Sequence, residues 1–463
     1  MVPRRCKMIQ KAKSTVSLFL VLSLILTGCS LAPPHVRPTA PIPQDWNGSR
    51  PGEHPTTQPE ILPWHQFILD SELKELIQTA LEENRNLRLA MLKVASLKAR
   101  YRIQDSERLP TLALDGSTDR SRSDGETSDN HTLSLGISGF ELDFWGRVQN
   151  LSQAALQEYL ATRAAGNMAR ITLISEVCQA YIRRMGAKAQ YDLILATLKS
   201  RETALEIMVQ RRLFGTASDL DYQEALSLRE QARASLEAMA RQVAQANNAL
   251  DLLVGKKQNT FRTAAAPNQL FAHVPANLSS TILLQRPDIM AAEHRLMARN
   301  AEIGAARAAF FPRITLTTQT GFSNAQLSDL FQSDSATWQF MPRLTLPIFN
   351  HGKLKASLNL IKVRKDMAIV EYEKAIQEAF RQVADNLIAQ ETLKREETHL
   401  TQLVHASARS LNLAKLRYEQ GIDNHLRYLD AQRADLANQT RLIQIRTQHQ
   451  MAIVKLFTSL GGG

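Results

Sequence analysis

Residues 141–147, Glu-Leu-Asp-Phe-Trp-Gly-Arg, separate two kinds of sequence in this chain of 463 residues. Before them, polar and apolar side chains alternate in residues 131–137, His-Thr-Leu-Ser-Leu-Gly-Ile, which predicts a β-strand with one apolar face. After them, residues 147–214 contain no proline, which predicts one continuous helix of 68 residues. Such a helix would be about 100 Å long, because each residue adds about 1.5 Å. A helix of this length cannot be enclosed in a globular domain.

The same pattern occurs a second time, 206 residues further along the chain. Three pairs of glycines share this offset: Gly146 and Gly352, Gly215 and Gly421, and Gly255 and Gly461. The proline-free segments between them match in length, with 68 residues in 147–214 and 353–420 and 39 residues in 216–254 and 422–460. We therefore predict two structural repeats, 66–265 and 266–463, each with a long helix, a glycine turn and a medium helix.

A shorter helix precedes each long one. Pro110 and Pro312, which lie 202 residues apart, both end helical stretches, because proline cannot continue a helix. The first stretch is predicted to begin near Asp70. The second is predicted to begin at Pro287, because proline suits the first turn and Asp288 favours the positive end of the helix dipole.

The inserts between the shorter and the long helices, residues 111–144 and 313–348, are predicted β-hairpins. Both contain alternating stretches, and we expect the polar segments 116–130 and 323–337 to be solvent-facing loops. Two hairpins supply only four strands, which cannot close a barrel, and a bilayer does not tolerate an open sheet edge. In an outer membrane, three copies would supply twelve strands, an even number of the kind found in barrels there. The residues alone also fit a soluble sheet on a helical rod, and they do not fix the number three.

The N-terminus has the features of a bacterial lipoprotein signal. A basic head is followed by the apolar run 16–26, which is too short to span a bilayer, and by residues 26–29, Leu-Thr-Gly-Cys. Cleavage would remove residues 1–28 and leave Cys29 to carry a diacylglycerol and an N-acyl chain, with no other cofactor predicted. The proline-rich residues that follow predict an extended tether over 29–65. The alternative is an ordinary secretory signal with a cysteine beside its cleavage site by chance.

Composition argues against several classes of function. Processing would lower the formal net charge from +11 to about +6, without any block of five like charges, so nucleic-acid binding has little support. It would leave Cys178 as the one ordinary thiol, too few for an intrachain disulfide, and we expect a small apolar residue of a helix there. The sequence has no metal-ligand spacing, phosphate-binding loop or nucleophile elbow. It therefore predicts no catalytic residue, no metal site and no enzyme activity.

Several motifs in order resemble those of the outer-membrane efflux channels of the TolC, OprM and NodT type, particularly the lipid-modified members. The most specific is Leu284-Gln285-Arg286-Pro287-Asp288-Ile289, with Phe310-Phe311-Pro312 downstream of it. Residues 141–147 and 347–352 resemble the two junctions between strand and long helix in that family. Residues 417–433, which begin Arg-Tyr-Glu-Gln-Gly, resemble its periplasmic tip.

This resemblance implies a mainly α-helical protein with a β membrane part. Each chain would contribute a duplicated set of long helices to an α-barrel and four strands to a twelve-stranded transmembrane β-barrel, which forms as a homotrimer. The implied function is the exit duct of a tripartite efflux pump, of the RND type or a similar one, that exports drugs or other small toxic compounds. The implied partners are outer-membrane lipid, a periplasmic adaptor (membrane fusion protein) and an inner-membrane transporter. The implied location is the outer membrane of a Gram-negative bacterium, with a lipid anchor and an extension into the periplasm.

The turns after the two long helices are the predicted adaptor-facing tips. Gly215 and Gly421 let the chain reverse there with positive φ at little cost. The offset of 206 also pairs the side chains of the two tips: Tyr418, Leu426, Asp430 and Arg433 correspond to Arg212, Leu220, Glu224 and Ser227.

The resemblance places a periplasmic gate on Leu426 and Asp430, with Tyr418 and Arg433 as neighbouring latch residues and Glu224 as the acid of the first repeat. A spacing of four puts Leu426 and Asp430 on one helix face. Threefold symmetry would bring three Asp430 carboxylates near the axis, where they would attract cations and repel one another. The residues alone favour a plainer interpretation, an exposed ion pair between Asp430 and Arg433.

Two other functions compete with a duct. A periplasmic adaptor lipoprotein also has an anchor and long helical hairpins, but this chain has no second β-rich module after its hairpins. A structural or adhesive coiled-coil lipoprotein would not need strand inserts at equivalent places in both repeats.

Overall fold

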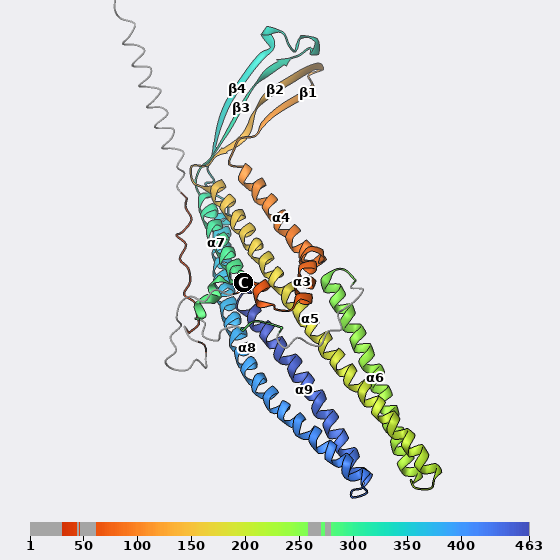
Figure 1. The fold of residues 1–463 in the computed structure, drawn as a ribbon. Helices are drawn as coiled ribbons and strands as arrows, with labels where there is room; N and C mark the ends of the chain where they lie inside the picture. The colour runs from red at the N-terminus through yellow and green to blue at the C-terminus, as the bar shows by residue number, and fades with distance from the viewer. Residues whose placement is uncertain (1–29, 44–45, 47–61, 258–269, 274–278, 463) are drawn as a thin grey trace, which may run out of the picture. The chain divides into compact units, whose positions relative to one another are not determined.

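The computed structural model describes residues 30–43, 46, 62–257, 270–273 and 279–462. The signal peptide and Cys29 lie outside these residues. The elements follow one another in the predicted order (Figure 1): α2 (Trp64–Phe67), α3 (Ser71–Glu83), α4 (Arg85–Ser106), β1 (Leu112–Ser123), β2 (Glu126–Leu142), α5 (Arg147–Leu213), α6 (Asp219–Val254), α7 (Pro287–Ala308), β3 (Arg313–Asn324), β4 (Ala336–Thr345), α8 (Lys353–Glu419) and α9 (His425–Ser459). Short 3₁₀ turns precede α7 and connect β3 to β4.

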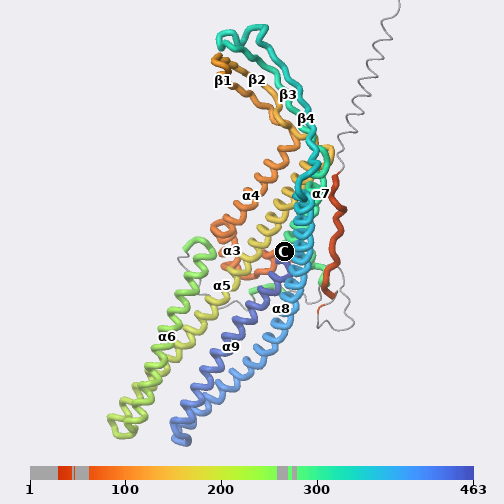
Figure 2. The backbone as a smooth tube through the Cα atoms, turned by 180° about the vertical axis from the view of Figure 1, so that it is seen from behind, coloured from red at the N-terminus to blue at the C-terminus, as the bar shows by residue number. Residues whose placement is uncertain are grey.

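The long helices of the two repeats are equal in length, as predicted. α5 and α8 have 67 residues each, and α6 and α9 have 36 and 35. α5 continues without a break through Gly166 and Gly186. In both views, α6 lies along α5 and α9 lies along α8, so each repeat forms one long helical hairpin (Figures 1 and 2).

Among the described helices, none is both long enough and apolar enough to cross a membrane.

The first shorter helix differs from its prediction, because it is two helices with a break at Asn84. Asn84 has the extended backbone of an N-cap, and its Oδ1 accepts a hydrogen bond from the Leu87 N–H (2.9 Å). Its Nδ2 donates to the carbonyl oxygen of Leu253 at the end of α6 (2.8 Å). The break therefore follows from a residue type that competes with the helix backbone and that caps α4 instead.

The strands form one antiparallel sheet in the order β1-β2-β3-β4. The pairing of β2 with β3 joins the hairpin of the first repeat to that of the second. Within the described residues, β1 and β4 pair on one side only. Alternate residues of β4 are apolar and exposed: Trp338 is 80% exposed, Phe340 59% and Leu344 63%. The sheet thus has two open edges and an apolar face in contact with solvent.

The prediction of a loop at residues 116–130 is wrong, because these residues extend both strands of the first hairpin. β1 and β2 pair continuously to Ser123 and Glu126, with only Asp124 and Gly125 between them. Both turn residues have positive φ (53° and 86°), the conformation of a type I′ turn, for which Asp-Gly is a preferred sequence. The strands are polar on both faces near the turn, so alternation did not reveal them. The predicted loop 323–337 is close to the observed connection between β3 and β4.

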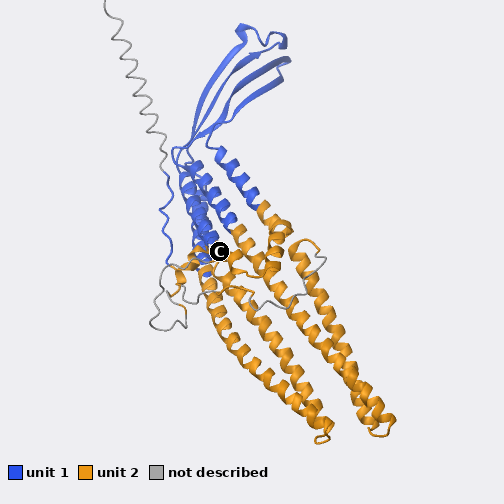
Figure 3. Ribbon diagram, in the orientation of Figure 1, with its two compact units in different colours: residues 1–39, 93–164, 290–374 blue, residues 40–92, 165–289, 375–463 orange. Residues whose placement is uncertain are grey.

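The chain divides into two compact units, and each draws residues from both repeats (Figure 3). The first consists of residues 1–39, 93–164 and 290–374 and contains the sheet. The second consists of residues 40–92, 165–289 and 375–463 and contains α6, α9 and most of the two long helices.

Residues 30–43 have neither helix nor strand, as an extended tether predicts. Within the first unit, side chains of α7 donate hydrogen bonds to the beginning of this segment: Asn300 Nδ2 donates to the Pro33 carbonyl (2.7 Å) and Arg307 Nη1 to the Leu31 carbonyl (3.0 Å). Arg37 forms an ion pair with Glu293 (2.6 Å). Most of the remaining predicted tether lies outside the described residues.

The second unit has an aromatic and aliphatic core where the helices of both repeats meet. The Phe67 ring stacks on Phe457 at a centroid distance of 4.0 Å and on Phe271 at 5.1 Å. Arg286, only 2% exposed, forms a bidentate pair with Asp288 and donates to the carbonyl oxygen of Ser459 (2.6 Å). The guanidinium therefore satisfies a carbonyl at the C-terminal end of α9, where a positive charge is favourable.

Cys178 is buried in α5, as expected for a small apolar residue. Burial raises the pKa of its thiol, because the thiolate would lose its hydration.

Candidate functional site

The tips of the two helical hairpins have the same backbone. Gly215 and Gly421 have φ of 71° and 74°, in the left-handed region that only glycine adopts freely. Both turns carry the two hydrogen bonds of a Schellman motif: Thr216 N–H to the Arg211 carbonyl (2.8 Å), Gly215 N–H to the Arg212 carbonyl (3.0 Å), Ile422 N–H to the Arg417 carbonyl (2.9 Å) and Gly421 N–H to the Tyr418 carbonyl (3.0 Å). The predicted tight turns at these glycines are confirmed.

The N-caps of the two return helices are equivalent as well. Ser218 caps α6 and Asn424 caps α9, and each side chain accepts a hydrogen bond from a backbone N–H three residues later. Asp221 completes a capping box at α6, because it accepts from both the backbone N–H and the hydroxyl of Ser218 (2.9 and 2.7 Å). These hydrogen bonds hold the pKa of Asp221 below its usual value.

The second turn is closed by an ion pair within its own hairpin. Arg417 pairs with Asp423 through two nitrogens (2.7 and 3.2 Å), and Arg427 lies 3.8 Å from the same carboxylate. The two arginines hold the pKa of Asp423 below its usual value, mainly through the hydrogen bond from Arg417.

The first turn has a different set of contacts. Arg212 pairs with Asp219 (2.7 Å) and covers the Tyr222 ring at 4.7 Å. Arg211 is the equivalent of Arg417 in this turn. Position 217, the equivalent of Asp423, is alanine, so Arg211 has no such acid in its own turn.

Arg211 instead reaches the second hairpin. Its Nη1 donates to the Tyr418 hydroxyl (2.7 Å), and its guanidinium lies 5.5 Å from the centroid of that ring. Tyr418 also stacks on Tyr428 at 5.8 Å and packs against the buried cluster of the first hairpin around Leu205 and Met208. Tyr418 therefore contacts both hairpins, and its partner Arg211 is a residue that sequence reasoning missed. The latch role of Tyr418 stays a prediction.

The predicted gate residues Leu426 and Asp430 both lie on the exposed surface of the chain. Leu426 is 56% exposed, and its equivalent Leu220 is 68% exposed. Asp430 lies 3.6 Å from Arg433, and both side chains are more than half exposed. This is the i, i+3 ion pair that the residues alone favoured. The gate role of these residues stays a prediction.

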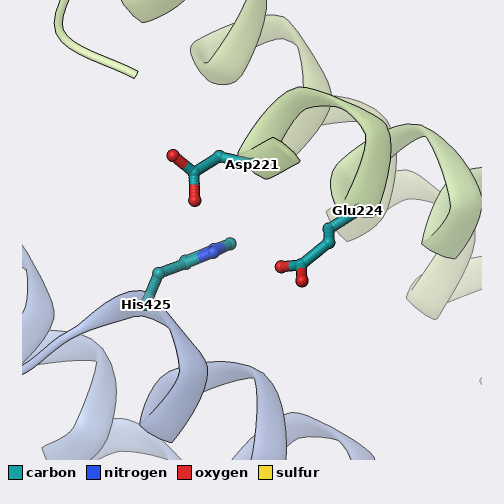
Figure 4. Close-up of side chains that lie close together, drawn as sticks. All are labelled: Asp221, Glu224 and His425. Atoms are coloured by element: carbon teal, nitrogen blue, oxygen red, sulfur yellow. The ribbon is translucent and has the colours of Figure 1, made fainter. Parts of the chain in front are cut away.

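The structure brings Glu224, the predicted gate acid of the first repeat, together with Asp221 and His425, which were not among the predicted site residues. Glu224 and Asp221 lie on the first turns of α6, and His425 is the first residue of α9 (Figure 4). One possible ligand atom from each of the three side chains lies within 4.8 Å of the other two. Sequence spacing could not reveal this group, because its members come from two hairpins about 200 residues apart.

Comparisons with known proteins agree with this architecture. The chain is 46% identical over 455 residues to outer membrane protein OprJ of Pseudomonas aeruginosa, across 96% of this chain and 95% of OprJ. It is 38% identical over 447 residues to cation efflux system protein CusC of Escherichia coli, across 96% and 98% of the two chains. The crystal structure of the open state of the MtrE outer membrane channel of Neisseria gonorrhoeae matches with a TM-score of 0.86 at 35% identity, across 94% of this chain and 98% of that one.

The chain has two long helical hairpins joined to strands from both repeats. Over nearly its full length it is similar to outer-membrane channels. These features define an outer-membrane efflux channel protein. The chain belongs to the outer membrane efflux protein family, whose model matches residues 76–256 and 278–462. This membership favours a channel over the adaptor and coiled-coil alternatives.

Proposed function

We propose that three copies of this chain form a continuous duct through the outer membrane and periplasm, and that the duct is the exit channel of a tripartite efflux pump. The observation that carries this proposal is the sheet, in which β1 and β4 each pair on one side only within the described residues. Joining β1 of one copy to β4 of the next would satisfy both open edges, as a bilayer requires. Three copies would then close a barrel of twelve strands.

The exposed side chains of the sheet support a membrane location for it. Trp338, Phe340 and Leu344 of β4, together with Leu112 and Leu114 of β1, are each at least 59% exposed. In a closed barrel these side chains would face lipid, where their burial is favourable. An acylated Cys29, followed by the extended residues 30–43, would add a lipid anchor to the same membrane.

The long helices would continue the duct into the periplasm, where their tips meet a periplasmic adaptor and, through it, an inner-membrane transporter. The cargo would be drugs or other small toxic compounds. Transport of this kind needs a polar passage and a closable end, and we assign no chemical step to the chain.

The closable end would be the tips. Three copies of Leu426 and Asp430 would form an apolar ring and an acidic ring around the axis. The contact between Arg211 and Tyr418 would hold the two hairpins of each copy together in the closed state.

The mass of the purified protein in detergent, measured by light scattering, tests the assembly. We expect three chains. Cysteine pairs with one member in β1 and one in β4 should cross-link between copies, and the buried Cys178 leaves the background low. A monomer without such cross-links would contradict the proposal. Replacement of Cys29 by Ser should abolish acylation, and a persisting acyl label would reject the lipid anchor.

A further inference from the structure

The cluster of Asp221, Glu224 and His425 is the one group of three or more potential metal-ligating side chains within the part of the chain that the structure describes. Asp221 and Glu224 are three residues apart on α6, so both carboxylates project from one helix face. His425 approaches from the other hairpin, and its ring is directed into the space between the two carboxylates (Figure 4). The group therefore offers one nitrogen and two carboxylates from two separate helices.

A second observation concerns the imidazole itself. His425 Nδ1 is buried, and it has no hydrogen-bond partner among the described residues. A buried polar atom without a partner costs free energy, and such atoms are uncommon unless a water or an ion completes the site. The ring of Tyr418 lies beside that of His425 at a centroid distance of 5.0 Å.

Asp221 is already fixed in position by Ser218. The two hydrogen bonds from Ser218 both go to Oδ2 of Asp221, which leaves Oδ1 for another partner. This arrangement matches the outer hydrogen bonds that orient carboxylate ligands in metal sites.

We propose that Asp221, Glu224 and His425 form a transition-metal site, suited to Zn²⁺, that bridges the tips of the two hairpins. Imidazole nitrogen and carboxylate oxygen are both ligands of Zn²⁺, and water would take the fourth position of a tetrahedral site. Mg²⁺ and Ca²⁺ prefer six or more oxygen ligands, which this group does not supply. Tetrahedral bonds of about 2.0 to 2.2 Å place ligand atoms about 3.4 Å apart, so the ligand atoms need to approach one another by at most about 1.4 Å from their present limit of 4.8 Å.

The bound ion would fasten α6 to α9 beside the contact of Arg211 with Tyr418. Both links join the first hairpin to the second, so metal binding would stabilise the closed tips. This regulatory consequence rests on the proposed channel function, whereas the metal site itself does not.

Binding of Zn²⁺ to the purified full-length protein in detergent, measured by competition with a chromogenic chelator, tests the site. We expect one tight site per chain in the unaltered protein. Glu224→Gln keeps the size of the side chain, and it should weaken binding by about tenfold or more, as should His425→Ala. His405→Ala, which removes an exposed histidine of α8, is the matched control and should leave the affinity unchanged.

Co²⁺ in place of Zn²⁺ gives a second measurement that needs no variant. A tetrahedral site with one nitrogen should produce visible absorption bands, which excess Zn²⁺ removes. Equal zinc affinity in the unaltered protein and in Glu224→Gln, or an octahedral cobalt spectrum of the unaltered protein, would overturn the site.

The effect of Zn²⁺ on conductance in a planar bilayer tests the regulatory consequence separately. Micromolar Zn²⁺ should lower conductance of the unaltered protein severalfold, and Glu224→Gln should remove this response. Tight zinc binding with unchanged conductance would overturn only the regulatory consequence. A protein that binds zinc but never conducts would refute the channel function.

Discussion

The two hairpin tips share a backbone and differ in the contacts that close them. Each has a glycine with positive φ, a Schellman motif and a capped return helix at equivalent positions. In the second tip, Arg417 is held by Asp423 of its own turn. In the first tip, alanine stands at the equivalent position 217, and Arg211 crosses to Tyr418 instead. The two tips therefore have the same backbone. The difference at position 217 leaves the first tip without an acid for Arg211, which contacts the second tip instead.

The largest effect is expected at the proposed gate. Replacing both Leu426 and Asp430 by Ala should raise passive conductance in a planar bilayer severalfold, because it would remove the proposed apolar barrier and acidic ring together. Replacing the first-tip equivalent, Leu220, by Ala should raise conductance much less. Equal conductance in the double variant and the unaltered protein would reject the gate assignment.

The next effect concerns the contact between the tips. Tyr418→Phe removes the hydroxyl that accepts from Arg211, and we expect a loss of about 1 kcal/mol after allowance for solvent exposure, or about fivefold more frequent opening. Amide hydrogen exchange in residues 205–225 and 415–435 would measure it.

Arg417→Met is the matched control, because it breaks an ion pair within the second turn. It should increase exchange only around that turn. Faster exchange of both tips in this variant, with none in Tyr418→Phe, would show that the latch lies elsewhere.

A smaller effect should follow from making the first tip resemble the second. Ala217→Asp places a carboxylate where Asp423 stands in the other repeat, so it should capture Arg211 within its own turn. Competition between two exposed partners is worth a fraction of 1 kcal/mol, so tip exchange should rise by about twofold to threefold. Double substitution with Tyr418→Phe should add little, and full additivity of the two changes would argue against a shared arginine.

The smallest effect is a difference in acid sensitivity. The folded pKa of Asp423 is lowered by Arg417, so the stabilisation from this pair is present above the unfolded pKa of about 3.9. It is lost as the pH falls through the folded pKa. Hydrogen exchange at the second turn should therefore accelerate on acidification toward about pH 3 beyond the intrinsic pH dependence, and Asp423→Asn should remove this excess.

The duplicated glycines and the proline-free segments were enough to predict the long helices and their turns, because these features depend on local backbone preferences. The strands near Asp124 and Gly125 were missed, since their polar side chains hide the alternation. The break at Asn84 could have been found, because asparagine is a favoured N-cap.

The contacts at the tips could not be predicted in the same way. Arg211 and Tyr418 are 207 positions apart in the sequence, which is far beyond the span of any local motif. The cluster of Glu224 and His425 likewise exists only once the hairpins lie together. Side chains that act between repeats depend on tertiary packing, which spacing along one helix does not encode.

Single-channel conductance of the purified protein in a lipid bilayer tests the central claim most directly, with the mass in detergent measured alongside. A trimer with small, cation-selective conductance that grows in the double variant of Leu426 and Asp430 is the predicted result. A monomer that does not conduct, with or without these substitutions, would contradict the claim that the hairpin tips close a duct.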